Sequence, residues 1–142
     1  MAAPLRAASA HRVAAALTAG ACLALLVVAA WLRPAAAGHG THEQLGLYPC
    51  VWAAAMDFPC PTCGMTTSFA HAADGHFLAA FTTQPMGTLL ALAAAMIFWL
   101  AAHQAIFASR IGRMTDAMTG TRLIWIGFAL LAGAWIYKIV VW

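Results

Sequence analysis

Residues 13–32 read VAAALTAGACLALLVVAAWL, twenty residues in succession without a charged side chain. Two further stretches share this character. His103 and Gln104 are the only strongly polar side chains of residues 86–107, and Lys138 is the only charge in residues 123–142. A helix needs about 20 apolar residues to cross the hydrocarbon core of a bilayer. Each stretch is therefore predicted to be a transmembrane helix, and Lys138 is expected to extend its ammonium group toward the membrane interface.

The composition of the whole chain also indicates a membrane protein. Of its 142 residues, 64% are hydrophobic and 8% are charged, whereas a soluble domain carries about 25% charged residues. A soluble fold of this size could not bury so much apolar surface. The net charge of +3 is too small for a phosphate-binding surface, so nucleic acid is not an expected partner. We expect an all-α, polytopic membrane protein, with residues 1–142 as a single membrane domain and the lipid bilayer as its partner.

The basic residues predict how the chain is oriented. Five of the seven lie on the segments that face one side of the membrane: Arg6, Arg12, Arg110, Arg113 and Arg122. Because cytoplasmic segments are enriched in Arg and Lys, this side is expected to be cytoplasmic, together with the N-terminus. Residues 33–85 are then extracytoplasmic. The first span is expected to remain as an anchor, since its twenty apolar residues exceed the roughly 7–15 of the apolar region of a signal peptide. A cleaved signal peptide ending near residues 35–37 is the alternative.

The extracytoplasmic segment, residues 33–85, holds the unusual chemistry of the chain. Three of the four cysteines and four of the six histidines lie in it: Cys50, Cys60, Cys63, His39, His42, His71 and His76. The pattern predicts an irregular loop over residues 49–61 with a short apolar piece, then helices over residues 65–73 and 76–82. Thr66 or Thr67 is expected to cap the first of these helices. The result is a short outward helical hairpin that lies on the membrane or, alternatively, is re-entrant.

Several positions in this segment have a distinctive spacing: Cys50, then Cys60-Pro61-Thr62-Cys63-Gly64-Met65-Thr66, then Gly75, and Pro85 before an apolar span. The pattern resembles a family of small bacterial membrane proteins catalogued as a domain of unknown function. Its signature reads Cys-Pro-x-Cys-Gly-x-Thr-Arg, with a further cysteine upstream. Thr67 stands where the family usually has Arg, Gln84 where Asn is usual, and Val51 where Pro is common. The resemblance implies a multi-pass protein of the bacterial inner membrane, and it implies no activity.

Cys60 and Cys63 form a Cys-x-x-Cys motif, which is compatible with three kinds of chemistry. A metal site would use Cys50, Cys60, Cys63 and His71 to bind zinc or another metal that prefers soft ligands. A structural disulfide would join Cys50 to one member of the pair, or close the pair on itself. Thiol–disulfide exchange would make the same three cysteines catalytic, with the N-terminus of the following helix lowering the pKa of Cys63. Covalent haem c is excluded, because Gly64 follows the pair where a histidine is needed.

These alternatives lead to two hypotheses about function. The first is a non-enzymatic structural, assembly or complex-subunit component, whose cysteines hold the hairpin by a disulfide or a metal. The second is a membrane thiol–disulfide oxidoreductase or metal-handling protein that uses the same cysteines. A face of small residues at Ala16, Gly20 and Ala24 favours close helix packing. The expected partners are therefore other membrane proteins or a second copy of the chain.

Overall fold

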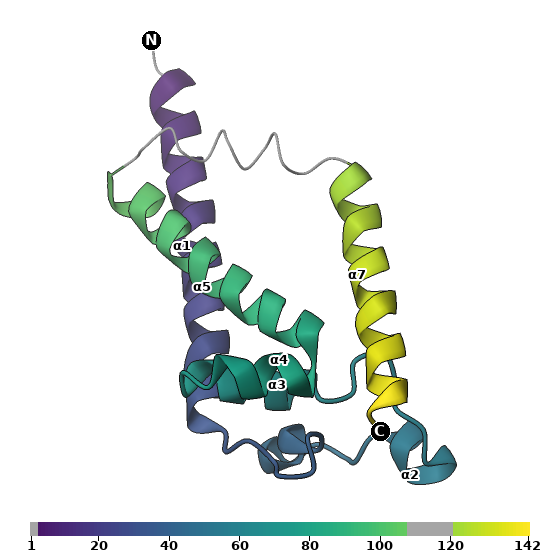
Figure 1. The fold of residues 1–142 in the computed structure, drawn as a ribbon. Helices are drawn as coiled ribbons and strands as arrows, with labels where there is room; N and C mark the ends of the chain where they lie inside the picture. Colours follow the sequence, from purple (N-terminus) through teal and green to yellow (C-terminus); the bar gives the residue numbers. More distant parts are fainter. Residues whose placement is uncertain (1–2, 108–120) are drawn as a thin grey trace.

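The computed structural model describes residues 3–107 and 121–142, and within these ranges it contains helices and no strand (Figure 1). Three long helices dominate it: α1 (Ala3–Trp31), α5 (Pro85–Phe107) and α7 (Thr121–Val140). Each contains a stretch long and apolar enough to cross a membrane. The prediction of an all-α, multi-pass membrane protein with three spans is therefore confirmed. Helix α1 begins earlier than predicted, because the alanine-rich residues before the apolar stretch also favour a helix.

Helices α1 and α5 pack against one another through alanines. The buried alanines are Ala15, Ala19 and Ala29 on α1 and Ala91, Ala94 and Ala101 on α5. At the far end of the pair, the Arg12 guanidinium donates a hydrogen bond of 3.0 Å to the carbonyl oxygen of Ala105. The prediction that Ala16, Gly20 and Ala24 form a helix contact is wrong for α1 and α5, since all three residues are exposed. Small residues do line the contact, but on the face one residue earlier in the chain.

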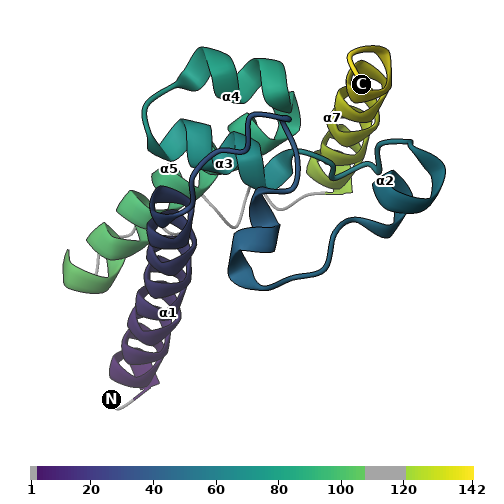
Figure 2. The same ribbon diagram turned by 90° about the horizontal axis from the view of Figure 1, so that it is seen from below.

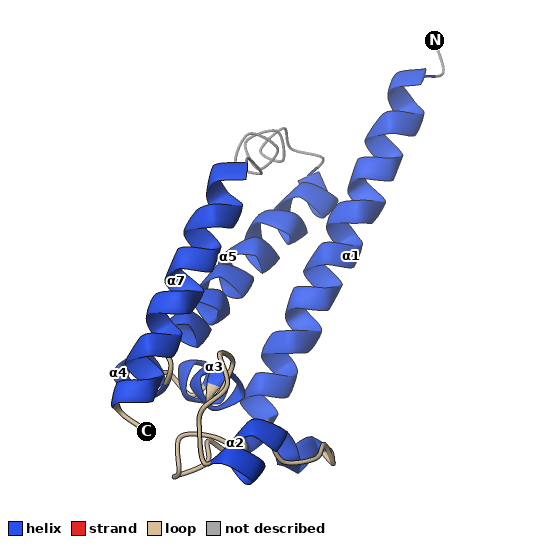
Figure 3. Cartoon of the chain, turned by 90° about the vertical axis from the view of Figure 1, so that its right-hand side faces the viewer, coloured by secondary structure: helices blue, strands red, loops and turns tan. Residues whose placement is uncertain are grey.

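Helix α7 stands beside this pair and touches the rest of the molecule mainly through its last two turns (Figures 1 and 3). Among its described side chains only Ala134 and Lys138 are buried. The Trp135 indole donates a hydrogen bond of 2.9 Å to the carbonyl oxygen of Pro59. The Tyr137 hydroxyl donates one of 2.8 Å to that of Thr82. The remaining apolar sides of α7 are exposed, as expected of a helix in contact with lipid.

We call the end of the molecule at which α1 ends, α5 begins and α7 ends the cysteine end (Figures 1 and 2). Residues 33–84 cover it with four short helices: η1 (Thr41–Leu45), α2 (Val51–Met56), α3 (Met65–Ala73) and α4 (Phe77–Thr83). The predicted hairpin is therefore present as α3 and α4. The turn between them follows its sequence signal, since Gly75 has a φ of +79° and the N–H of His76 returns to the carbonyl of His71 at 2.9 Å.

The hairpin is locked to α5 by buried hydroxyl groups. The Ser68 Oγ lies 2.9 Å from the carbonyl oxygen of Ala80, 3.0 Å from that of Gln84 and 2.9 Å from the Thr88 Oγ1. A Cβ atom added to Gly87 would lie 2.9 Å from the Ser68 Cβ, so the two backbones approach closely only because Gly87 has no side chain. These bonds hold α3, α4 and α5 together without any cysteine.

The predicted threonine cap of α3 is wrong. Gly64 occupies the N-cap position and makes no side-chain capping bond. The Thr67 hydroxyl is instead fully buried and lies 2.8 Å from the Thr41 Oγ1. Thr41 in turn accepts a hydrogen bond of 3.0 Å from the N–H of Ala35. Thr67, which stands where the family that the sequence resembles usually has Arg, therefore connects α3 to η1.

Candidate thiol site

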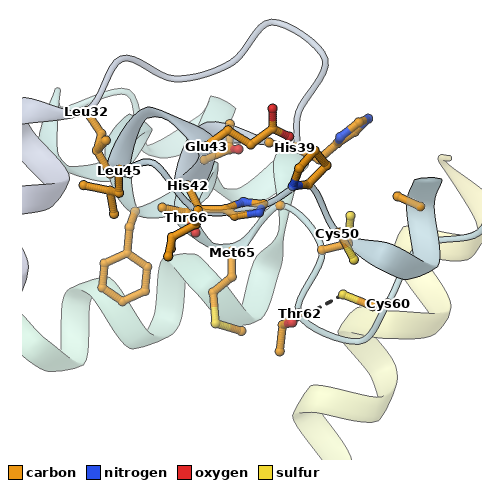
Figure 4. A pocket seen from close by; sticks show the side chains of 18 of the residues that line it. Leu32, His39, His42, Glu43, Leu45, Cys50, Cys60, Thr62, Met65 and Thr66 are labelled. Atoms are coloured by element: carbon orange, nitrogen blue, oxygen red, sulfur yellow. Dashed lines mark hydrogen bonds between the residues drawn. The ribbon is translucent and has the colours of Figure 1, made fainter. Parts of the chain in front are cut away.

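The cysteine end contains a cavity of about 840 Å³ between α1, η1, α2 and the turn that carries the cysteine pair (Figure 4). Leu25 and Val28 of α1, Leu32 directly after α1, and Leu90 of α5 give it an apolar wall. Cys50, Cys60 and Cys63 all line it on the side of the loop. The chain thus brings together the three cysteines that the sequence singled out. The fourth cysteine, Cys22, lies within α1 and is not part of this site.

Cys50 and Cys60 point toward one another from two sides of the loop around α2 (Figure 4). Cys50 immediately precedes α2, and its sulfur accepts a hydrogen bond from the backbone N–H of Ala53, which lowers its pKa. The Cys60 thiol acts on the Cys50 sulfur in the same direction, while partial burial opposes both. The Cys60 Sγ also lies 3.4 Å from the Thr62 Oγ1. Hydrogen bonds to the charged form favour it, so the Cys50 thiol ionises more easily than an ordinary thiol.

Cys63 has the opposite environment. It is 5% exposed, and burial, together with the neighbouring Cys60, raises its pKa to about 11. The turn before α3 is closed by the Cys63 N–H, which donates to the carbonyl of Cys60 at 2.9 Å. The expectation that the helix N-terminus lowers the pKa of Cys63 is therefore wrong, because desolvation of the thiolate outweighs any favourable dipole.

The ammonium group of Lys138 lies close to the turn that carries Cys63 and Gly64. Lys138 is 7% exposed, and its Nζ donates to the carbonyl oxygens of Gly38 and Thr83, each at 3.4 Å. It also lies 5.9 Å from the centre of the Trp142 ring. Its charge favours the Cys63 thiolate, although less strongly than burial opposes it. The expected reach toward the membrane interface is thus replaced by a buried position that joins α7 to the cysteine turn.

Sequence reasoning missed this role of Lys138 and the residues around it. Trp142 also stacks on the His39 ring, with ring centres 4.8 Å apart and planes inclined by 28°. The available signal was the single charge in an otherwise apolar span, since a lysine in that setting needs polar partners. The partners themselves are backbone carbonyls about 55 and 100 positions away, which no local pattern reveals.

His71, the expected fourth metal ligand, lies apart from the cavity. It does not line the cavity; its ring lies 6.4 Å from that of His76, and its Nδ1 is buried without a hydrogen-bond partner. In residues 3–107 and 121–142, no group of three or more His, Cys, Asp or Glu side chains is placed to hold a metal ion. The metal-ligand set of Cys50, Cys60, Cys63 and His71 therefore stays a prediction.

Fold and site together define a three-span α-helical membrane protein with a thiol-lined cavity at one end of its bundle. Residues 50–98 match the family described as "Protein of unknown function (DUF2752)". The expected resemblance to a domain of unknown function is thereby confirmed. The matched stretch begins at Cys50 and takes in α2, α3, α4 and the first half of α5, so it contains all three cysteines of the site. No curated protein and no solved structure matches the chain.

Proposed function

We propose that this protein catalyses thiol–disulfide exchange in the bacterial inner membrane, with Cys50 and Cys60 as its redox pair. One observation carries the proposal: the two thiols face one another at the wall of an open cavity (Figure 4), while the hairpin is held by Ser68 and its partners instead. A structural disulfide is not needed where hydroxyl groups already hold the elements together. The cysteines are therefore available for chemistry.

The lowered pKa of Cys50 makes its thiolate the attacking group of the first step. The Cys50 thiolate attacks one sulfur of a partner disulfide, forms a mixed disulfide and releases one partner thiolate. The Cys60 thiolate then attacks the Cys50 sulfur, forms the Cys50–Cys60 disulfide and releases the second partner thiol. One dithiol and one disulfide are consumed, and one of each is formed. The reverse sequence delivers a disulfide to a reduced partner.

The distribution of basic residues supports the location that this chemistry needs. Five of the seven Lys and Arg residues belong to sequence segments predicted to face the side of the membrane opposite the cysteine end, and such an excess is expected when that side is cytoplasmic. The cysteine end then faces the oxidising side of the inner membrane, where disulfides form and persist.

Exchange with oxidised glutathione tests the proposal on the full chain in detergent micelles. The reduced protein should yield a Cys50–Cys60 disulfide, identified by peptide mass spectrometry. Cys50→Ser should abolish the reaction. Cys60→Ser should instead accumulate a glutathione mixed disulfide on Cys50, because the attacking thiol of the second step is missing. Cys22→Ser is the control and should behave as the unaltered chain. A disulfide between Cys60 and Cys63 would contradict the proposal. So would serine variants that fold less well but exchange with glutathione at an unchanged rate per folded molecule.

A second candidate function, a subunit of a larger membrane complex, is favoured by α7. Its sides are exposed along most of its length, and only Ala134 and Lys138 are buried among its described side chains. Such a helix has room for a partner helix as well as for lipid. Cross-linking in native membranes from cysteines placed at Ile126 or Leu130 tests this candidate. Adducts of one defined mass would support it, and the absence of any adduct would exclude it.

A further inference from the structure

The cavity beside the thiols has two chemically different sides. Leu25 and Val28 come from α1, Leu32 follows α1 directly, and Leu90 comes from α5. Both α1 and α5 are of membrane-spanning length. An apolar tail that lies in the bilayer beside α1 and α5 would meet this side of the cavity. The opposite side carries the Cys50 and Cys60 thiols, the Thr62 hydroxyl and the imidazoles of His39 and His42, several of which are visible in Figure 4. An occupant that satisfies both sides has an apolar tail and a polar head.

The charge and shape of the polar side define the head more closely. Among the described residues that line the cavity there are two carboxylates, Glu43 and Asp57, and neither Lys nor Arg. A phosphate head group would meet two carboxylates and no cation there, so a head group without negative charge is favoured. His39 and Trp142 both line the cavity, and their rings are stacked 4.8 Å apart. Their π faces suit a planar ring. The volume of about 840 Å³ is within the range of about 300–1,000 Å³ that accommodates small organic ligands.

We propose that this cavity binds the head group of an isoprenoid quinone, which takes two electrons from the Cys50–Cys60 dithiol. The inference rests on the proposed thiol function and names its electron acceptor. A quinone is a neutral, planar, lipid-soluble molecule that accepts electrons in pairs, and oxidation of a dithiol delivers a pair. Two S–H bonds break and one S–S bond forms. The two protons and two electrons pass to the quinone oxygens, so that one hydroquinone is made for each disulfide.

The test uses the reduced full chain in nanodiscs with a short-tailed ubiquinone. Hydroquinone formation is followed by ultraviolet absorbance, and the Cys50–Cys60 disulfide by thiol-specific gel shift. We expect one hydroquinone for each disulfide formed. Val28→Trp places an indole on the side of the cavity that α1 lines, and should lower the rate with quinone at least tenfold relative to the rate with oxidised glutathione.

Val27→Trp is the matched control. Val27 is the neighbouring residue of α1, is 59% exposed and does not line the cavity, so this variant should retain both rates. Monodisperse elution and an unchanged helical circular dichroism spectrum establish that each variant is folded. Equal effects of Val27→Trp and Val28→Trp, or no hydroquinone from the unaltered chain, would overturn the inference. A phospholipid found in the cavity by native mass spectrometry, undisplaced by ubiquinone, would overturn it as well.

Glutathione exchange separates the two proposals. If the chain exchanges with glutathione but does not reduce ubiquinone, the quinone inference fails and the thiol function stands. If neither reaction occurs, the thiol function fails and the quinone inference fails with it.

Discussion

The ammonium nitrogen of Lys138 lies 3.3 Å from the position that a Cβ atom on Gly64 would occupy, and the carbonyl oxygen of Gly38 lies 2.6 Å from that position. Gly64 also has a φ of +82°. The residue after the cysteine pair must therefore be glycine for two reasons, its backbone conformation and the absence of space. The contact joins the cysteine turn, the loop after α1 and the end of α7 at one point.

Gly64→Ala should consequently destabilise the protein more than the same change at Gly75. Both glycines have positive φ, but nothing lies within 4 Å of a Cβ on Gly75 (φ +79°). Gly75→Ala therefore measures the backbone strain alone, about 1 kcal/mol. The clash at position 64 should add roughly 1–3 kcal/mol. Thermal unfolding in detergent, followed by far-ultraviolet circular dichroism, compares the stabilities of the two variants. Equal losses would show that the Lys138 and Gly38 contacts are not formed.

The hairpin makes a second prediction, which concerns Ser68. Ser68→Ala removes a buried hydroxyl that lies within 3.0 Å of the Ala80 carbonyl, the Gln84 carbonyl and the Thr88 hydroxyl. Leaving such groups unpaired costs about 1–3 kcal/mol. We expect a lower unfolding temperature, and also faster proteolysis between α3 and α5. Thr82→Ala is the control, because the exposed Thr82 hydroxyl bonds only within its own helix, to the carbonyls of Leu78 and Ala79. Similar losses in both variants would contradict the proposed lock.

The elements that the sequence predicted correctly are those with local signals. The ends of α3 and α4 follow from apolar periodicity and from the Asp74–Gly75 turn, and α5 begins at Pro85, which is well suited to a first helical turn. The Thr67 side chain shows where local reasoning fails. A threonine near a helix start predicts a cap, but here it bonds Thr41, 26 positions earlier in the chain. Burial decided its role.

The thiol site was predictable only in part, for the same reason. The spacing of the cysteines correctly predicts that Cys50, Cys60 and Cys63 lie together. Their environments depend on contacts between distant segments: Cys63 is buried beside Lys138 of α7, whereas Cys50 faces Cys60 across a loop without apolar periodicity. The opposite pKa directions of Cys50 and Cys63 follow from this packing, and the helix-start argument alone gives the wrong sign for Cys63.

A third prediction concerns orientation. If the cysteine end is extracytoplasmic, a cysteine at Ala36, which is exposed, should react with a membrane-impermeant maleimide in intact cells. A cysteine at Ser109, in the segment between the second and third predicted spans, should react only after the membrane is permeabilised. Both are introduced into a chain without native cysteines. The opposite pattern would invert the orientation and place the thiols in the reducing cytoplasm, where the exchange proposal loses its source of disulfides.

The last prediction is the order in which the thiols react with an alkylating reagent. Only the thiolate is nucleophilic, so a lowered pKa moves the reaction to lower pH and a raised pKa moves it to higher pH. In the reduced, folded chain, a short iodoacetamide pulse at pH values from 6 to 11, read by peptide mass spectrometry, should show Cys50 with a midpoint below that of an ordinary thiol. The midpoint for Cys63 should lie near the upper end of this pH range, since its pKa is about 11. Near neutral pH, Cys50 should react at least about tenfold faster than Cys63, even allowing for the greater intrinsic nucleophilicity of a high-pKa thiolate. The same pulse on the chain unfolded in detergent and urea is the control, and there the two rates should converge. Equal rates in the folded chain, or faster reaction at Cys63, would show that Cys50 is not the attacking thiol of the proposed exchange.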